Sequence, residues 1–302
     1  MEKRQIGQSA RTRELSPRQV AEAVGVSESS LKRWCDNGSI PSRRTAGGHR
    51  RIPIAGLVDF LRRKGFDAKR PDLLGLPAGA HRDGRTMSQV VPEFERALTT
   101  GDGGRADAIL LGLYLAGHSI AEICDGLIAP TFHAIGRAWE SEKIEIYQER
   151  RAVELTRHAL HELSRTLKPA PAGAPLALSA TLAGDPYTLA ISMIEVVLRE
   201  LGWLATSLGP NHPAPTLCAA IDQLGPRLVC VNVSWIEDEA RLLSALRALH
   251  EDAREHRAAL AIGGPALTRD IRQRIRYTAF CESMTELVGL AESLWHRPAA
   301  RG

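Results

Sequence analysis

The stretch LALSATLAGDPYTLAISM, residues 176–193, joins an apolar run, a loop of turn-forming residues and a helical pattern. It predicts a buried strand, a loop and a helix. Four further apolar runs alternate with helical patterns downstream: LATSL (204–208), RLVCVNVS (227–234), ALAIGG (259–264) and YTAF (277–280). Such alternation predicts parallel strands joined by helical crossovers, and the loop at the carboxyl end of such a strand commonly binds a ligand.

Two segments rich in proline, glycine and alanine interrupt the chain upstream, within residues 65–85 and at PAPAGAP, residues 169–175. They predict linkers at 71–85 and 169–175. The residues between the two linkers, 86–168, have helical spacing and no strand signal. The predicted fold is therefore multidomain, α and α/β, with a head at 1–70, a helical bundle at 86–168 and an α/β domain at 176–302.

The composition excludes several classes of protein. No apolar run approaches the ~20 residues that cross a bilayer, and the N-terminus lacks the apolar segment of a signal peptide. We therefore expect a cytoplasmic protein with no membrane partner. The five cysteines are scattered and form no C-x-x-C pair, which argues against a disulfide framework or a zinc site.

Charge is distributed unevenly along the chain. Residues 1–70 carry 16 lysines and arginines against 7 acidic residues, whereas residues 71–302 carry 23 against 28. A compact basic unit on an acidic body indicates a head that binds a polyanion such as duplex DNA.

The head contains the pattern of a helix-turn-helix in SPRQVAEAVGVSESSLKRWCD, residues 16–36. Ser16 and Ser27 are placed to cap two helices, Gly25 ends the first, and we expect Gly38 to end the second. The second helix presents short polar and basic side chains that suit the major groove.

A wing follows in PSRRTAGGHRRI, residues 41–52, where basic residues flank a Gly-Gly turn. Two basic strands of this kind can straddle a phosphate backbone. The predicted DNA contacts of both elements are Ser29, Ser30, Arg33, Arg43, Arg44, His49, Arg50 and Arg51. Together, the helix-turn-helix and the R-x(4)-G-x-R wing resemble the DNA-binding domain of the MerR family. Lys32, Arg62 and Arg63 are as consistent with plain surface charge as with DNA contacts.

In the helical module, Trp139 lies ten residues before Glu149, and Arg150 follows. This arrangement resembles the W-x(9)-E-H motif of light-sensing cobalamin-dependent repressors of the CarA, CarH and LitR type. The resemblance implies that Trp139 covers the upper face of a corrin and that Glu149 lies beside its upper ligand. Arg150 stands where that family has histidine. The alternative is a core tryptophan and a surface acid in a charge run.

The last module resembles the cobalamin-binding domain of the same repressors, a flavodoxin-like fold. Asp185, Tyr187 and Ala190 stand where the family has D-x-H-x-x-G. The resemblance implies that Ser234, Gly263 and Gly264 line the slot for the nucleotide tail. It also implies that position 187 is the cobalt ligand, oriented by Asp185. A tyrosine phenol, with a pKa near ~10, is a poor cobalt donor at neutral pH.

Three alternatives remain for this module. It holds cobalamin without a histidine ligand, it holds another tetrapyrrole such as haem or a bilin, or it holds nothing and serves oligomerisation and signal relay. Phenolate ligates ferric haem in some proteins. Further candidate contacts, each more often a surface or structural histidine, are His133, His158, His161 and His212.

We therefore predict a DNA-binding transcriptional regulator that binds an operator as a homo-oligomer, a dimer or a tetramer, and senses a tetrapyrrole and possibly light. One competing class is an enzyme, because related pairs of bundle and sheet carry methyl groups for methyltransferases. The absence of a further catalytic domain and of a histidine at position 187 argues against it. A second is an antirepressor whose wing contacts protein instead of DNA.

Overall fold

The computed structural model describes residues 13–295. The chain divides into two compact units, Met1–Lys168 and Pro169–Gly302. Within residues 13–295, no helix is long and apolar enough to cross a membrane.

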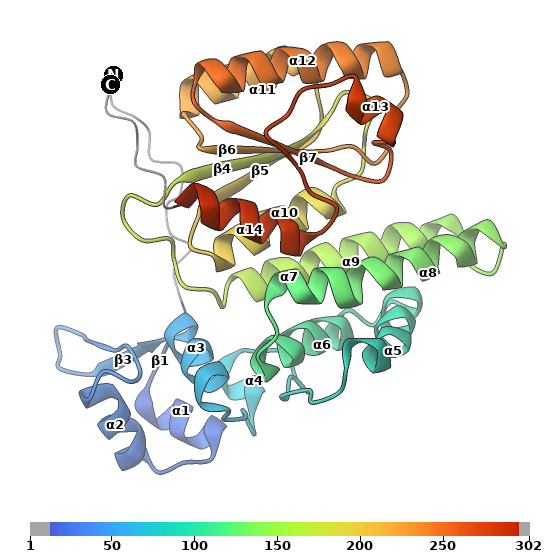
Figure 1. Ribbon diagram of the computed structural model, residues 1–302. Coiled ribbons are helices and arrows are strands. Elements are labelled where there is room, and N and C mark those ends of the chain that lie inside the picture. Colours follow the sequence, from blue (N-terminus) through green and yellow to red (C-terminus); the bar gives the residue numbers. More distant parts are fainter. Residues whose placement is uncertain (1–12, 296–302) are drawn as a thin grey trace. The chain divides into compact units, whose positions relative to one another are not determined.

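The first unit begins with a small winged helical fold (Figure 1). Its helices are α1 (Pro17–Val24), α2 (Glu28–Asp36) and α3 (Ile54–Lys64), and its strands are β1 (Glu14–Leu15), β2 (Arg43–Arg44) and β3 (Arg50–Pro53). The strands form an antiparallel sheet in the order β1-β3-β2. The predicted helix-turn-helix and the predicted basic hairpin are both present.

The local signals at the helix ends explain where these helices start and stop. Ser16 forms a capping box with Gln19, and Gly25 ends α1 with φ of 76°. The Ser27 side chain accepts the Ser30 N–H and caps α2. Helix α2 ends at Asp36 with Asn37 as its C-cap, and Gly38 follows with φ of 75°, so the predicted glycine closes this helix.

The segment 71–85, predicted to be a linker, is instead packed into the first unit. Pro71–Leu74 forms helix α4, which contacts α1, and Leu74 and Leu76 are buried. Arg82 donates hydrogen bonds to the Leu115 and Ala116 carbonyls at the end of a bundle helix. Proline and glycine mark turns in a sequence, but turns can still bury the leucines between them.

The rest of the first unit is the predicted helical bundle. Its elements are α5 (Met87–Thr100), α6 (Gly103–Ala116), α7 (Ile120–Ile123), the π-helical turn η1 (Cys124–Ile128), α8 (Ala129–Glu140) and α9 (Ile146–Ser164). Because α7, η1 and α8 follow one another without a break, four helical segments pack together.

The second unit is a parallel sheet between two layers of helices. Its strands are β4 (Leu176–Leu182), β5 (Leu204–His212), β6 (Leu228–Asn232), β7 (Ala259–Gly263) and β8 (Ala279–Phe280). All five predicted strands are present, paired in parallel in the order β5-β4-β6-β7-β8. This is a flavodoxin-like order, in which the chain changes direction between β4 and β6.

Helices cover both faces of this sheet (Figure 1). Helices α10 (Leu189–Glu200) and α14 (Met284–Trp295) pack together on one face, and α11 (Ala214–Leu224) and α12 (Glu239–Glu255) pack together on the other. The short helix α13 (Arg269–Gln273) precedes β8. Alternate side chains of the strands supply two apolar cores, one containing Leu246 and Leu260 and the other Trp203 and Leu228.

Candidate functional site

The recognition helix α2 is held by its apolar face. Leu31 is fully buried. The Trp34 ring lies 5.0 Å from the Phe60 ring and 5.3 Å from the Phe66 ring, which fixes α2 against α3. Arg33 is exposed on the opposite face. The packing therefore presents the polar face of α2 to solvent.

The hydroxyls predicted to contact DNA belong to the cap of this helix. Ser27 Oγ lies 2.9 Å from Ser29 Oγ and 2.9 Å from Ser30 Oγ. Ser29 is exposed and Ser30 is half-buried. Lys32 pairs with Glu28 at 2.8 Å on the same surface. The cap thus pre-orients both serines at the amino end of α2, where backbone N–H groups favour a phosphate.

The wing is a tight hairpin in which Arg44 lies opposite Arg50 and Arg43 lies opposite Arg51. Its turn closes through hydrogen bonds from Thr45 N to His49 O, 2.8 Å, and from Gly48 N to Thr45 O, 2.9 Å. Arg44 and His49 are exposed at its tip.

Two of the predicted DNA contacts are engaged within the protein. The Arg43 guanidinium donates two hydrogen bonds to the Glu14 carboxylate, at 2.5 and 2.7 Å. Arg50, with 15% of its side chain exposed, donates to Asp36 Oδ1 at 2.5 Å and to the Lys32 carbonyl at 2.9 Å. Arg50 therefore joins the wing to the recognition helix.

We expect Asp36→Ala and Arg50→Ala each to weaken operator binding about fivefold, because each change breaks the same partly exposed pair, worth about 1 kcal/mol. If Arg50 instead acted only as a phosphate contact, Asp36→Ala would free it, remove a negative charge and strengthen binding. Fluorescence anisotropy with operator DNA distinguishes the two. Glu22→Ala removes an exposed acid from α1 and is the matched control.

A second arginine joins the head to the bundle. Arg62 in α3 donates hydrogen bonds to the carbonyls of Gly117, 3.1 Å, and His118, 2.9 Å, just beyond the end of α6. Its guanidinium lies 4.3 Å from the centre of the Tyr114 ring. Lys168 Nζ also pairs with Asp59 of α3 at 2.9 Å. A cation is stabilised at a helix carboxyl end, so Arg62 has a docking role that its sequence context did not indicate.

The turn between α8 and α9 exposes a group of large apolar side chains. Trp139 is 47% exposed, Ile146 53% and Tyr147 60%. Trp139 ends up at the surface, which excludes the interpretation as a core tryptophan. Glu149 pairs with Arg150 at 3.4 Å in the first turn of α9. We call Trp139, Ile146 and Tyr147 the bundle aromatic face.

The carboxyl edge of the sheet is organised around Asp185, which is 2% exposed. Its Oδ1 accepts the Tyr187 N–H at 3.0 Å, and its Oδ2 accepts the Ser234 N–H at 2.6 Å and the Trp235 N–H at 3.4 Å. Burial raises the pKa of Asp185, and these hydrogen bonds oppose that rise. Asp185 therefore clasps the loop after β4 to the loop after β6, where we had expected it to orient the side chain at position 187.

The other predicted residues of this edge also support the loops. Ser234 Oγ accepts from Asn232 Nδ2 at 2.7 Å. A Cβ on Gly264 would lie 2.3 Å from the Val233 oxygen, and one on Gly263 would lie 2.8 Å from the Cys281 oxygen. At both positions a neighbouring backbone leaves no space for a Cβ, so glycine is required.

Two recesses lie at the carboxyl edge of the sheet. The space beside Asp185, Val233 and Trp235 amounts to about 10 Å³, room for about one water molecule. A separate groove of about 360 Å³ lies between the end of β4 and the starts of α11 and α12, lined mainly by apolar residues together with His212 and Arg241. Tyr187 and Trp235 are 37% and 57% exposed beside the clasped loops.

The residues of this edge do not fit cobalamin ligated by a histidine at position 187. Tyr187 stands where the resemblance implies the cobalt ligand, and both Asp185 oxygens already accept hydrogen bonds from the backbone. Of the additional histidines, only His212 lies at this edge of the sheet, where it is paired with Leu182 at the end of β4. His133, His158 and His161 are exposed on α8 and α9, and His212 Nε2 lies 2.8 Å from the Leu208 oxygen.

Known proteins match both the head and the body. Residues 14–65 match the family model of a helix-turn-helix domain, and residues 91–164 match that of a B12 binding domain. The chain is 24% identical over 283 residues to the HTH-type transcriptional repressor CarA of Myxococcus xanthus, a match that covers 90% of this chain and 94% of that protein. These matches confirm the prediction of a transcriptional regulator with a DNA-binding head and favour it over an enzyme.

One solved structure shows the fold of the body. The monomethylamine corrinoid protein of Methanosarcina barkeri has a TM-score of 0.56 and 15% sequence identity, and the match covers 68% of this chain and 99% of that one. This likeness confirms the predicted combination of a helical bundle and a parallel sheet domain.

Proposed function

We propose that this transcriptional regulator binds its operator through a MerR-type winged head as a homo-oligomer, and that its body senses haem or a bilin. The observation that carries the ligand proposal is the position of exposed apolar side chains. Within residues 13–295, all five large apolar side chains with high exposure lie on the bundle aromatic face or at Tyr187 and Trp235. Each of these two groups of exposed side chains, taken by itself, offers a surface to a flat apolar ligand.

The chemistry at the sheet edge favours a tetrapyrrole that needs no histidine ligand at position 187. Tyr187 stands at that position, and both Asp185 oxygens accept backbone hydrogen bonds. The Tyr187 phenol can ligate ferric haem as phenolate, and a bilin requires no axial ligand. The similarity to a repressor supports repression as the output.

Absorption spectroscopy of the full chain titrated with hemin, biliverdin and hydroxocobalamin tests this proposal. We expect hemin or biliverdin to bind with a shifted visible spectrum, and Trp235→Ala to weaken that binding about tenfold through the loss of a stacked ring, worth about 1–2 kcal/mol. If hemin is the ligand, Tyr187→Phe changes its spectrum, whereas Tyr277→Phe, in a ring packed beside Phe280, does not. The bound ligand should also change operator affinity.

Tight binding of hydroxocobalamin with a protein histidine on cobalt would contradict the proposal. If none of the three tetrapyrroles binds, the second candidate stands, a cofactor-free body that relays a signal and oligomerises. We expect a homo-oligomer because two linked heads bind two half-sites far more tightly than one head binds one. Sedimentation of the full chain at several concentrations tests this expectation.

A further inference from the structure

The α/β unit has a second concave surface, between helix α12 and the segment before β8. Helix α12 begins beyond the carboxyl end of β6 and ends before the amino end of β7. Residues 274–276 lead into the amino end of β8. Arg274 pairs with Glu239 at the start of α12, whereas Arg254 lies in the last turn of that helix, so the surface follows the length of α12.

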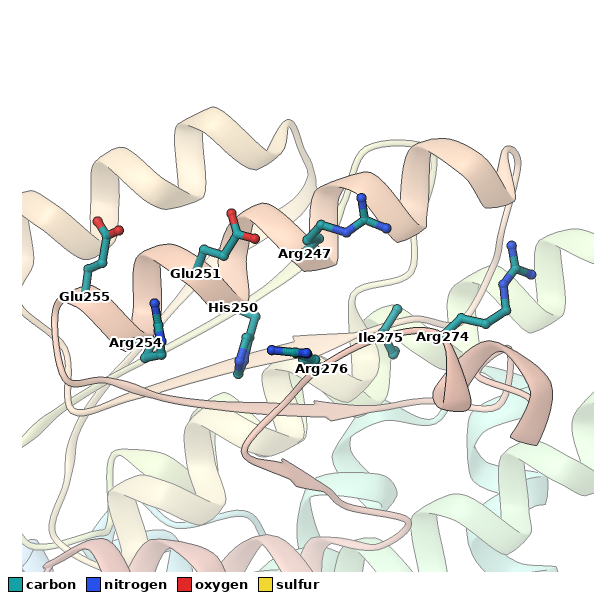
Figure 2. Close-up of a pocket in the computed structure, with 8 residues that line it drawn as sticks. All are labelled: Arg247, His250, Glu251, Arg254, Glu255, Arg274, Ile275 and Arg276. Atoms are coloured by element: carbon teal, nitrogen blue, oxygen red, sulfur yellow. The ribbon is translucent and has the colours of Figure 1, made fainter.

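These two segments enclose a groove of about 580 Å³ (Figure 2). Its nitrogen-bearing side chains are Arg247, His250 and Arg254 from α12 and Arg274 and Arg276 from the segment before β8. The spacing of three and four residues places the α12 members along one side of that helix. In Figure 2, His250 points toward the segment that carries Arg276.

The concentration of arginine here is unusual for this unit. Residues 176–295 contain ten arginines, no lysine and fourteen acidic residues, yet four of the ten arginines line this one groove. Arg274 pairs with Glu239. For Arg247, Arg254 and Arg276, the described part of the chain provides no ion pair with an acidic side chain.

Ordinary structural roles do not account for this arrangement. An arginine in the last turn of a helix stabilises the negative carboxyl end, which explains Arg254. Arg247 lies about two turns earlier, and Arg276 lies on a different segment. Holding several guanidinium groups around one groove costs electrostatic repulsion unless an anion offsets it.

We propose that this groove binds an organic phosphate of nucleotide size. Guanidinium groups present paired donors that match phosphate oxygens, and the volume lies in the range of small-molecule sites. Glu251 and Glu255 at the rim can accept hydrogen bonds from hydroxyl or amino groups of the same ligand. These carboxylates and the net negative charge of the unit disfavour a continuous polyanion such as DNA. The proposal does not depend on the tetrapyrrole proposed above.

Calorimetric titration of the full chain with ATP and with inorganic pyrophosphate, in the absence of DNA, tests the groove. The double variant Arg247→Ala/Arg276→Ala should bind ATP at least about tenfold more weakly through the loss of charge-assisted hydrogen bonds. Arg276→Lys keeps the charge but loses the paired donors, so we expect an intermediate loss. Thermal melts establish that each variant is folded.

Two control variants each remove one arginine that lies outside the groove. Arg269→Ala changes an exposed arginine at the start of α13, and Arg44→Ala changes the wing tip; both should leave ATP affinity within about twofold. The proposal is overturned if neither ATP nor pyrophosphate binds, or if Arg269→Ala weakens binding as much as the double variant. It is also overturned if the double variant alters only operator affinity or only the oligomeric state, which would identify a nucleic-acid or protein contact.

Discussion

The affinity of the full chain for operator DNA should fall about a thousandfold between 50 and 200 mM monovalent salt. Two heads that each neutralise about three phosphates give a slope of log affinity against log salt of about −5. The exposed arginines Arg33 and Arg44 and the basic wing supply these contacts. Anisotropy titrations at four salt concentrations measure the slope.

Individual substitutions should separate phosphate contacts from structural arginines. Arg44→Ala should flatten the slope by about one unit for each head in contact, because each neutralised phosphate contributes about one unit. Arg96→Ala removes an exposed arginine from the bundle helix α5 and should leave the slope unchanged. Affinity that does not vary with salt would show that the wing does not contact DNA and would support the antirepressor alternative.

Gly264→Ala should destabilise the α/β unit by about 3 kcal/mol or more, the range of strained and overpacked substitutions. Gly264 has φ of 112°, and a Cβ there would lie 2.3 Å from the Val233 oxygen and 2.7 Å from its carbonyl carbon. Both neighbours are backbone atoms, so relief requires the loop after β6 to move. Urea denaturation followed by circular dichroism measures the loss.

Gly289→Ala is the matched control for this effect. Gly289 lies within helix α14 of the same unit, and a Cβ there would meet no atom within 4 Å. Replacing it should stabilise the helix by about 0.5–1 kcal/mol. Equal stability of the two variants would mean that the loop after β6 moves to accommodate the added methyl group.

The sequence by itself determined the elements whose signals are local. Ser16 and Ser27 cap the helices of the head, the Gly-Gly turn produces the wing, and five apolar runs become the five parallel strands. These features depend on hydrogen bonds and side-chain periodicity within a few residues, so a single sequence reveals them. The sequence also determined that Tyr187 stands at the position where the resemblance implies a cobalt ligand.

Only the tertiary structure decided what several polar side chains do. Arg50 pairs with Asp36, Arg62 with the carbonyls beyond α6, and Asp185 with the loop after β6. The two segments of the arginine groove are likewise about twenty residues apart in the chain. Packing brings such partners together, and charge or residue type does not specify which of many distant partners a side chain meets. The sequence therefore indicated where the candidate sites lie. The tertiary structure showed that Arg50 joins the wing to α2 and that Asp185 joins the loops after β4 and β6.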